Sequence, residues 1–567
     1  MNRNPTFWDV LLLSSFVILI TFQPFFLHHE IIMMETGIHL PALNALFHGQ
    51  IPYKDFYFLR GPLELYVPAG MMLVAGKNAA LLPLFYYGGT VLTFLFCVLV
   101  GKHLFRTRWI LYIMIPVLIA RTFPRVSYYY WGGMRYAIGF LALWLGILFF
   151  KSQKRRWIYL AGLVSCLAFL TTVEAGVSVI FAFVAALGFA YLFQVQPRNF
   201  VLKSAGFYVL GFLSVLMPYL IYIAATNSLM PFLESMYAVV RFNHVAYPGE
   251  PGVRPETFLD FLGAFYPGSR YFKYMTPAFC YLFFAVYLVQ KIRRKELSPT
   301  DAFLVGVAGY GLVLYAAAFR KIEGHHFEMA LQPEKFLLFF MFEEVWLYFK
   351  TFSKSRLKSL AVQLAVCFFI AGSIGYAIQR YDHRFAMFKW IKKEILHQAG
   401  VKGLSLLENM ESETLHLKRV DGITVPKWQA EEIRGVVEFL EKNTSPDEKV
   451  FTYPELGNFN FYADRPFVGR FPIVTFTWMY QPWHEELFAE LKKSKPQYVI
   501  MTNLGHRTFP HVWYFRNPKN KERFEQFTRF ILDHYEVVKV FESVSIYRLK
   551  PQTFGAYART KGYKIRR

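Results

Sequence analysis

The sequence predicts a polytopic α-helical membrane protein of about 11 transmembrane helices, followed by a small extracytoplasmic α/β domain at the C-terminus. Two observations support this fold class. Of the 567 residues, 55% are hydrophobic and only 18% are charged, a composition unlike that of ordinary soluble enzymes. Apolar runs recur along the first two thirds of the chain, and hydropathy falls from Asp382 onward.

The apolar runs have the length of membrane spans, about 17 to 25 residues each, although a few are short. We place them at 10–27, 80–100, 109–120, 136–150, 157–171, 177–194, 204–226, 274–290, 302–319, 336–349 and 360–379. The first run follows Arg3 and has no small-residue cleavage site, so we interpret it as a retained span. All four cysteines fall inside apolar stretches without a CxxC pair, which is typical of core residues.

Lys and Arg are distributed unevenly over the loops. With a cytoplasmic N-terminus, the inner loops contain 17 Lys and Arg in 38 residues, and the outer segments contain 13 in 135. Because positive residues favour the cytoplasmic side, we expect the first loop and the C-terminal domain to lie outside. The net charge of +23 is then explained by topology, and no nucleic-acid partner is expected.

The first outer loop, 28–79, carries charged side chains in an aromatic background. Its apolar residues recur at helical spacing at Ile38, Leu40, Leu43, Leu46 and Phe47. We interpret 35–48 as an interfacial helix and 49–62 as a clamp punctuated by Pro and Gly.

The stretch GQIPYKDFYFLRGPLELY, preceded by Glu35 and Gly37, resembles the first large loop of bacterial polytopic glycosyltransferases of the GT-C superfamily, relatives of protein mannosyltransferases and lipid A aminoarabinose transferases. Those proteins usually have an acidic pair where this chain has Met34-Glu35-Thr36. The resemblance implies a GT-C fold in the bacterial inner membrane. It also implies inverting transfer of a hexose or pentose from a polyprenyl-phosphate donor to a glycan, lipid or protein acceptor of the cell envelope.

Such a transfer needs a base for the acceptor hydroxyl, and a carboxylate near the membrane surface is the usual choice. Glu35 is the first candidate and Glu30 its competitor; Glu174, at the outer turn between the fifth and sixth spans, is a second acid. The alternative for Glu35 is a helix-start acid that faces the helix dipole. The alternatives for Glu174 are to orient a substrate or to cap the sixth span.

The leaving lipid phosphate needs a cation opposite it, preferably a guanidinium. The candidates are Arg60, Arg135, Arg320 and Lys321, all on the outer side. The alternative is that an arginine at a span end extends to lipid headgroups. In the clamp, Asp55 and Tyr53 are predicted to order the loop, with Asp55 capping the turn after Pro52-Tyr53.

No metal ligand or other cofactor is assigned. His325 and His326, together with Glu323, are candidate ligands for a divalent metal. Adjacent histidines point apart in most backbones, however, and no tetrahedral set is evident.

The chain divides into a transmembrane module at 1–381, a linker at 382–425, a soluble domain at 426–551 and a basic tail at 552–567. Alternating helix and strand patterns predict the α/β class of the soluble domain. The predicted helices are 430–442, 484–493 and 522–534, and the predicted strands are 449–453, 497–502, 537–541 and 543–549.

Two other functions are compatible with this pattern. A transporter or flippase of lipid-linked sugars is the first, although such proteins tend to have paired broken spans and charges near the midplane, whereas the charges here gather at one rim. A catalytically inactive glycan-binding relative is the second, suggested by Met34 in place of an acid.

Overall fold

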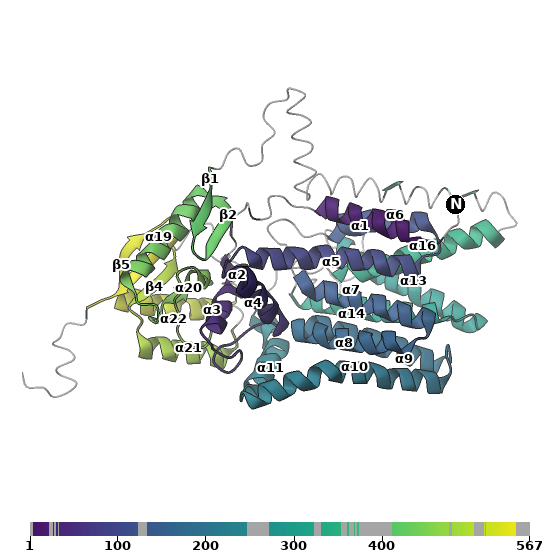
Figure 1. The fold of residues 1–567 in the computed structure, drawn as a ribbon, viewed down its shortest axis with the longest axis horizontal. Helices are drawn as coiled ribbons and strands as arrows, with labels where there is room; N and C mark the ends of the chain where they lie inside the picture. The colour runs from purple at the N-terminus through teal and green to yellow at the C-terminus, as the bar shows by residue number, and fades with distance from the viewer. Residues whose placement is uncertain are drawn as a thin grey trace, which may run out of the picture.

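The structure is a computed structural model with two parts, a bundle of long helices and an α/β region at one end of it, with the first loop between them (Figure 1). It describes residues 4–21, 27, 30–31, 33–122, 133–246, 272–321, 330–352, 360–361, 364, 368, 371–372, 411–475, 479–503, 515 and 517–551.

Each predicted span up to 336–349 coincides with a helix. These helices are α1 (Phe7–Thr21), α5 (Leu81–Leu104), α6 (Arg108–Thr122), α7 (Gly133–Ser152), α8 (Arg155–Thr171), α9 (Val173–Leu192), α10 (Arg198–Ala225), α13 (Phe272–Arg294), α14 (Pro299–Lys321) and α16 (Gln332–Phe352). Among the described residues, 5 helices are long and apolar enough to cross a membrane, namely α5, α7, α9, α10 and α14. A multi-pass membrane protein is therefore confirmed. The last predicted span, 360–379, lies mostly outside the described residues, and the total number of spans stays a prediction.

Close helix packing in the bundle depends on small residues. A Cβ atom added at Gly162 of α8 would lie 2.0 Å from the Tyr208 carbonyl oxygen of α10, and one added at Gly211 of α10 would lie 2.0 Å from the Tyr159 oxygen of α8. Glycines at both positions let the two backbones touch, as is common between membrane helices.

The first loop forms three helices. The continuous helix predicted at 35–48 is instead α2 (Met33–Gly37) and α3 (Leu40–Phe47), separated by a turn. The physical reason is Pro41, which lacks an N–H and therefore suits the first turn of a helix and not its interior. The clamp itself is not helical, and α4 (Leu63–Ala75), which was not predicted, follows it directly.

The α/β region contains all the helices and strands predicted for it. They are α19 (Lys427–Asn443), β3 (Phe451–Tyr453), α21 (Gln481–Ser494), β4 (Tyr498–Thr502), α22 (Pro518–His534), β5 (Tyr535–Val540) and β6 (Val544–Leu549). The sheet order is β3-β4-β6-β5, with β3 and β4 parallel and the other pairs antiparallel. β4 is buried along its whole length, as expected for a central strand.

Two further features of this region were not predicted. One is a hairpin of β1 (Ser412–Leu417) and β2 (Val420–Pro426), which lies mostly in the range interpreted as linker. The other is the short helix α20 (Asn458–Tyr462). Residues 382–410 and 552–567 lie outside the described part of the chain.

The α/β region docks on the first loop and shares a hydrophobic core with it; Leu43 of α3 and Val436 of α19 belong to one buried cluster. Asn44 of α3 donates to the Asn460 carbonyl at 3.2 Å and accepts a 2.7 Å hydrogen bond from Arg419. The first loop is therefore held between the bundle and the α/β region, where Figure 1 shows it.

Candidate functional site

The candidate site is a group of charged and polar side chains at the end of the bundle beneath the first loop. We call it the rim cluster, and it consists of His39, Arg60, Glu64, Tyr86 and Arg135. Four of the five are buried, and the Arg60 side chain is 12% exposed. They come from the turn before α3, the end of the clamp, α4, α5 and α7.

The clamp reaches this position because Gly61 touches the end of α8. Its N–H donates to the Thr171 carbonyl at 2.9 Å. A Cβ atom at Gly61 would lie 2.2 Å from the Leu170 carbonyl oxygen, so no larger residue fits without displacement. The next turn of chain begins α9, where Thr172 caps the helix and Glu174 lies in the first turn. Arg60 and Glu174 are thus brought to the same end of the bundle.

Glu64 is the centre of the rim cluster. Its side chain is 0% exposed, and its Oε2 lies 3.2 Å from Arg60 Nη1 and 3.5 Å from His39 Nε2. The Tyr86 hydroxyl lies 2.6 Å from His39 Nε2 and donates to Glu64 Oε2 at 3.5 Å. The other oxygen, Glu64 Oε1, has no hydrogen-bond partner among the described residues.

Glu64 stays ionised in this environment. Burial raises the pKa of the carboxyl, but the charge of Arg60, the hydrogen bond and charge of His39, and the charge of Arg135 together outweigh it and hold the pKa at about 2. A carboxylate with so low a pKa is a poor general base near neutral pH. Its geometry suits it to fix Arg60 and His39 in place.

Further charges lie around the Tyr136 hydroxyl of α7. Arg60, Glu64, Arg135 and Glu174 all act on it electrostatically. Arg135 and Glu174 also act on the Tyr310 hydroxyl of α14. Arg60, Arg135 and Glu174, which lie far apart in the sequence and were predicted as site residues, therefore gather in one place together with Glu64.

Three other predicted site residues have side chains outside the described part of the chain. The backbone of Glu35 lies in α2, and Arg320 and Lys321 end α14. Their proposed roles stay predictions. Glu30 is half-buried next to Ile31, whose N–H donates to Gln429 of α19 at 2.8 Å.

Both side chains predicted to order the clamp, Asp55 and Tyr53, form hydrogen bonds within it, and the ordering role itself stays a prediction. Asp55 Oδ2 accepts a 2.8 Å hydrogen bond from the Ile51 N–H. Tyr53, with a φ of 68°, donates from its hydroxyl to the Arg60 carbonyl at 2.8 Å. Tyr53 thereby fixes the backbone of the residue that pairs with Glu64.

Sequence reasoning gave no role to His39, Glu64 or Tyr86. Arg60 and Glu64 are four residues apart, one on each side of Gly61-Pro62. This spacing can indicate an ion pair at the start of a helix. No sequence signal identifies His39 and Tyr86, because both reach the cluster through tertiary packing.

The described residues were also searched for side chains that could bind a metal ion. In the described ranges, no group of three or more His, Cys, Asp or Glu side chains could hold a metal ion. His325, His326 and Glu323 lie outside those ranges.

The comparisons with known proteins give a match in fold. No protein-family model and no curated protein sequence matches the chain. ArnT from Cupriavidus metallidurans bound to undecaprenyl phosphate matches with a TM-score of 0.52 and 10% identity, over 97% of this chain and 100% of that one. The same protein in the apo state matches with a TM-score of 0.52 and 11% identity, over 96% and 98%.

A third structure is less similar. The archaeal oligosaccharyltransferase AglB from Archaeoglobus fulgidus, in complex with an inhibitory peptide and a dolichol-phosphate, has a TM-score of 0.48 and 12% identity, over 88% of this chain and 69% of that one. The two ArnT structures show that this chain has an ArnT-like fold over nearly its full length. This agrees with the fold that the resemblance of the first loop implied.

Proposed function

We propose that this chain is an inverting glycosyltransferase that moves a sugar from a polyprenyl-phosphate donor to a cell-envelope acceptor on the outer face of the bacterial inner membrane. The observation that carries the proposal is the gathering of Arg60, Arg135, Glu64 and Glu174 at one end of the bundle. The fold supports it, because ArnT, which shares this fold, has been solved with undecaprenyl phosphate bound.

The two arginines would stabilise the leaving group. When the bond between the anomeric carbon and the phosphate oxygen breaks, negative charge grows on the lipid phosphate, and guanidinium groups fixed opposite it stabilise that charge. Glu64 holds Arg60 in position through the 3.2 Å ion pair. Arg320 and Lys321, predicted from the sequence, are proposed as further phosphate ligands.

The acceptor hydroxyl would attack the anomeric carbon from the opposite side and lose its proton to a carboxylate. Glu64, with a pKa of about 2, does not suit this role. We therefore keep Glu35 as the proposed base, with Glu30 as its competitor, and propose that Glu174 orients the donor sugar or the acceptor. One displacement inverts the configuration, and no covalent intermediate is needed.

The test begins with mass analysis of cell-envelope glycans in a deletion strain complemented with variants. Wild type is expected to restore a sugar that the deletion removes, and Glu35→Gln and Glu174→Gln are expected not to restore it. For the purified protein in lipid nanodiscs, the readout is release of polyprenyl phosphate from a polyprenyl-phosphate sugar in the presence of envelope acceptor. Arg135→Lys is expected to lower kcat/KM by roughly 10- to 100-fold, because Lys cannot grip two phosphate oxygens.

Arg548→Lys, an exposed residue of β6, is the matched control and should keep full activity. Unchanged glycans with both carboxylate variants, together with movement of an intact lipid-linked sugar across vesicle membranes, would contradict the proposal and favour a flippase.

A further inference from the structure

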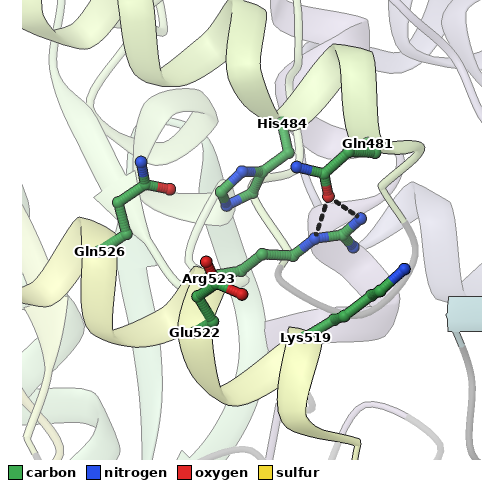
Figure 2. Close-up of a pocket in the computed structure, with 6 residues that line it drawn as sticks. All are labelled: Gln481, His484, Lys519, Glu522, Arg523 and Gln526. Carbon is green, nitrogen blue, oxygen red and sulfur yellow. Dashed lines mark hydrogen bonds between the residues drawn. The ribbon is translucent and has the colours of Figure 1, made fainter.

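A second polar site lies in the α/β region, separate from the rim cluster. It is a cavity of about 220 Å³ between α21 and α22 (Figure 2). Its lining side chains are polar or charged, namely Gln481, His484, Lys519, Glu522, Arg523 and Gln526. None of these residues belongs to the rim cluster or to the proposed transfer mechanism.

Two of the lining residues form a fixed wall. Arg523 donates from Nε and Nη2 to Gln481 Oε1 at 3.0 Å and 2.6 Å, and from Nη1 to the Met479 carbonyl at 2.9 Å. The Gln481 amide nitrogen in turn donates to Glu485 at 2.8 Å. These interactions hold the Arg523 side chain in the position that Figure 2 shows.

His484 contributes an unpaired acceptor to the cavity. The residue is only 2% exposed, and its Nε2 has no hydrogen-bond partner among the described residues. The ring lies edge-on to Phe527 at 5.0 Å, and the Arg523 backbone hydrogen-bonds the imidazole. Burial, and then the Arg523 charge, lower the pKa to about 4, so the imidazole is neutral at physiological pH. The hydrogen bond with the Arg523 backbone uses the other ring nitrogen. In the neutral imidazole Nε2 is then an acceptor, and it can accept a hydrogen bond from a ligand.

The remaining lining groups narrow the class of ligand. Glu522 offers acceptors, Lys519 offers donors, and the Gln526 amide offers both. A phosphomonoester dianion has no O–H and cannot donate to His484, whereas a sugar hydroxyl both donates and accepts. The volume is below the roughly 300–1,000 Å³ of typical small-molecule sites, which favours a ligand of about one sugar ring. We infer that this cavity binds one neutral sugar residue, by hydrogen bonds from its hydroxyls to His484 and Glu522.

The cavity adjoins the contact between the α/β region and the rest of the chain. Trp483, directly before His484, donates to Glu234 of α11 (Leu229–Ala246) at 2.9 Å, and its ring lies 4.4 Å from that of Tyr57 in the clamp. A sugar bound in this cavity would therefore sit beside the first loop. Binding does not depend on the proposed transfer reaction, because the two sites share no residue.

The experiment is saturation-transfer NMR on the full chain in lipid nanodiscs, with a panel of methyl hexosides and pentosides as probes and inorganic phosphate as a comparison. We expect saturable binding of at least one glycoside. His484→Phe and Gln526→Leu should each weaken it by roughly three- to tenfold, the effect of one hydrogen bond. Gln526 is exposed, so its variant keeps the test usable if the buried His484→Phe chain does not fold.

Two controls separate the cavity from other sites. Lys521 and Glu525 lie on α22 outside the cavity and pair with each other at 3.8 Å, so Lys521→Ala and Glu525→Ala should leave binding unchanged. Absence of binding by every glycoside, binding of phosphate in competition with them, or equal loss in the controls would overturn the inference.

Discussion

Glu64 is a fully buried carboxylate that remains charged because of the residues around it. The nearest cation, Arg60, is four residues earlier in the chain, and His39 and Arg135 add to its effect. Removing one partner of a buried pair leaves the other charge without compensation, which is far more costly than the loss of a surface pair. The role of this residue in stability can therefore be tested without knowing the substrate.

We expect Glu64→Gln to lower the free energy of unfolding by about 3 kcal/mol, because Arg60 then keeps a buried positive charge without its carboxylate. The measurement is thermal unfolding in detergent. Glu536→Gln is the matched control, since Glu536 pairs with Arg548 at 2.6 Å on an exposed edge, and it should change Tm little. Equal changes in the two variants would contradict a buried ion pair.

The pH dependence of stability should also depend on Glu64. Its pKa is about 2 in the folded chain against an ordinary value of 4.5, so between these values the unfolded chain binds more protons. Stability from this group is complete above about pH 4.5 and is lost as the pH falls toward 2. Between pH 5 and pH 3, Tm should fall further in wild type than in Glu64→Gln. Parallel curves would show that the folded pKa is not depressed.

At the residue scale, the sequence identified charges but not their partners. Arg60, Arg135 and Glu174 were recognised because charged side chains at span ends on the outer side are unusual. The connection of Glu64 to His39 and Tyr86 depends on how α3, α4 and α5 pack, and no local pattern encodes that packing.

At the scale of elements, the contact between the clamp and α8 determines where Arg60 lies. We expect Gly61→Ala to destabilise the chain by at least about 2 kcal/mol, because its Cβ would meet the Leu170 backbone at 2.2 Å. Activity should fall as well, since Arg60 would be displaced. Gly70→Ala, in α4 with nothing within 4 Å of the added Cβ, is the control and should be neutral or stabilising. Thermal unfolding and the release assay together distinguish the two variants.

The helices and strands of the α/β sheet were predictable, but α4 and the hairpin β1–β2 were not. The helices and strands of the α/β region were found because their apolar patterns repeat over several residues. The hairpin β1–β2 was missed because its two-residue turn is Lys418-Arg419, without the usual Gly, Asn or Asp, while Asp421-Gly422 lies inside β2. The break between α2 and α3 was missed because the apolar spacing continues through it.

At the scale of the whole molecule, the first loop and the α/β region share a hydrophobic core. Buried side chains from both belong to one hydrophobic cluster, and Asn44 and Arg419 connect them by a 2.7 Å hydrogen bond. The sequence predicts them as separate parts, because contacts between segments so far apart leave no periodic signal in either one.

We expect the fragment 411–551, expressed alone, to expose the apolar face that packs on the first loop, and therefore to aggregate or to bind a hydrophobic dye. Fusing residues 33–79 to the fragment should restore a cooperative unfolding transition. Size-exclusion chromatography and dye fluorescence measure both. A monomeric, cooperatively folded fragment without the loop would contradict a shared core.

The shared core also affects how the chain is made. Asn44 and its partner Asn460 are separated by 416 positions, so at ordinary rates of synthesis the first loop emerges tens of seconds before the surface that completes it. During that interval its aromatic side chains have no protein partner, and the bilayer interface is the nearest apolar environment that can bind them. Biogenesis of this protein is thus expected to include a stage in which the loop rests on lipid until the distal part of the polypeptide has been synthesised.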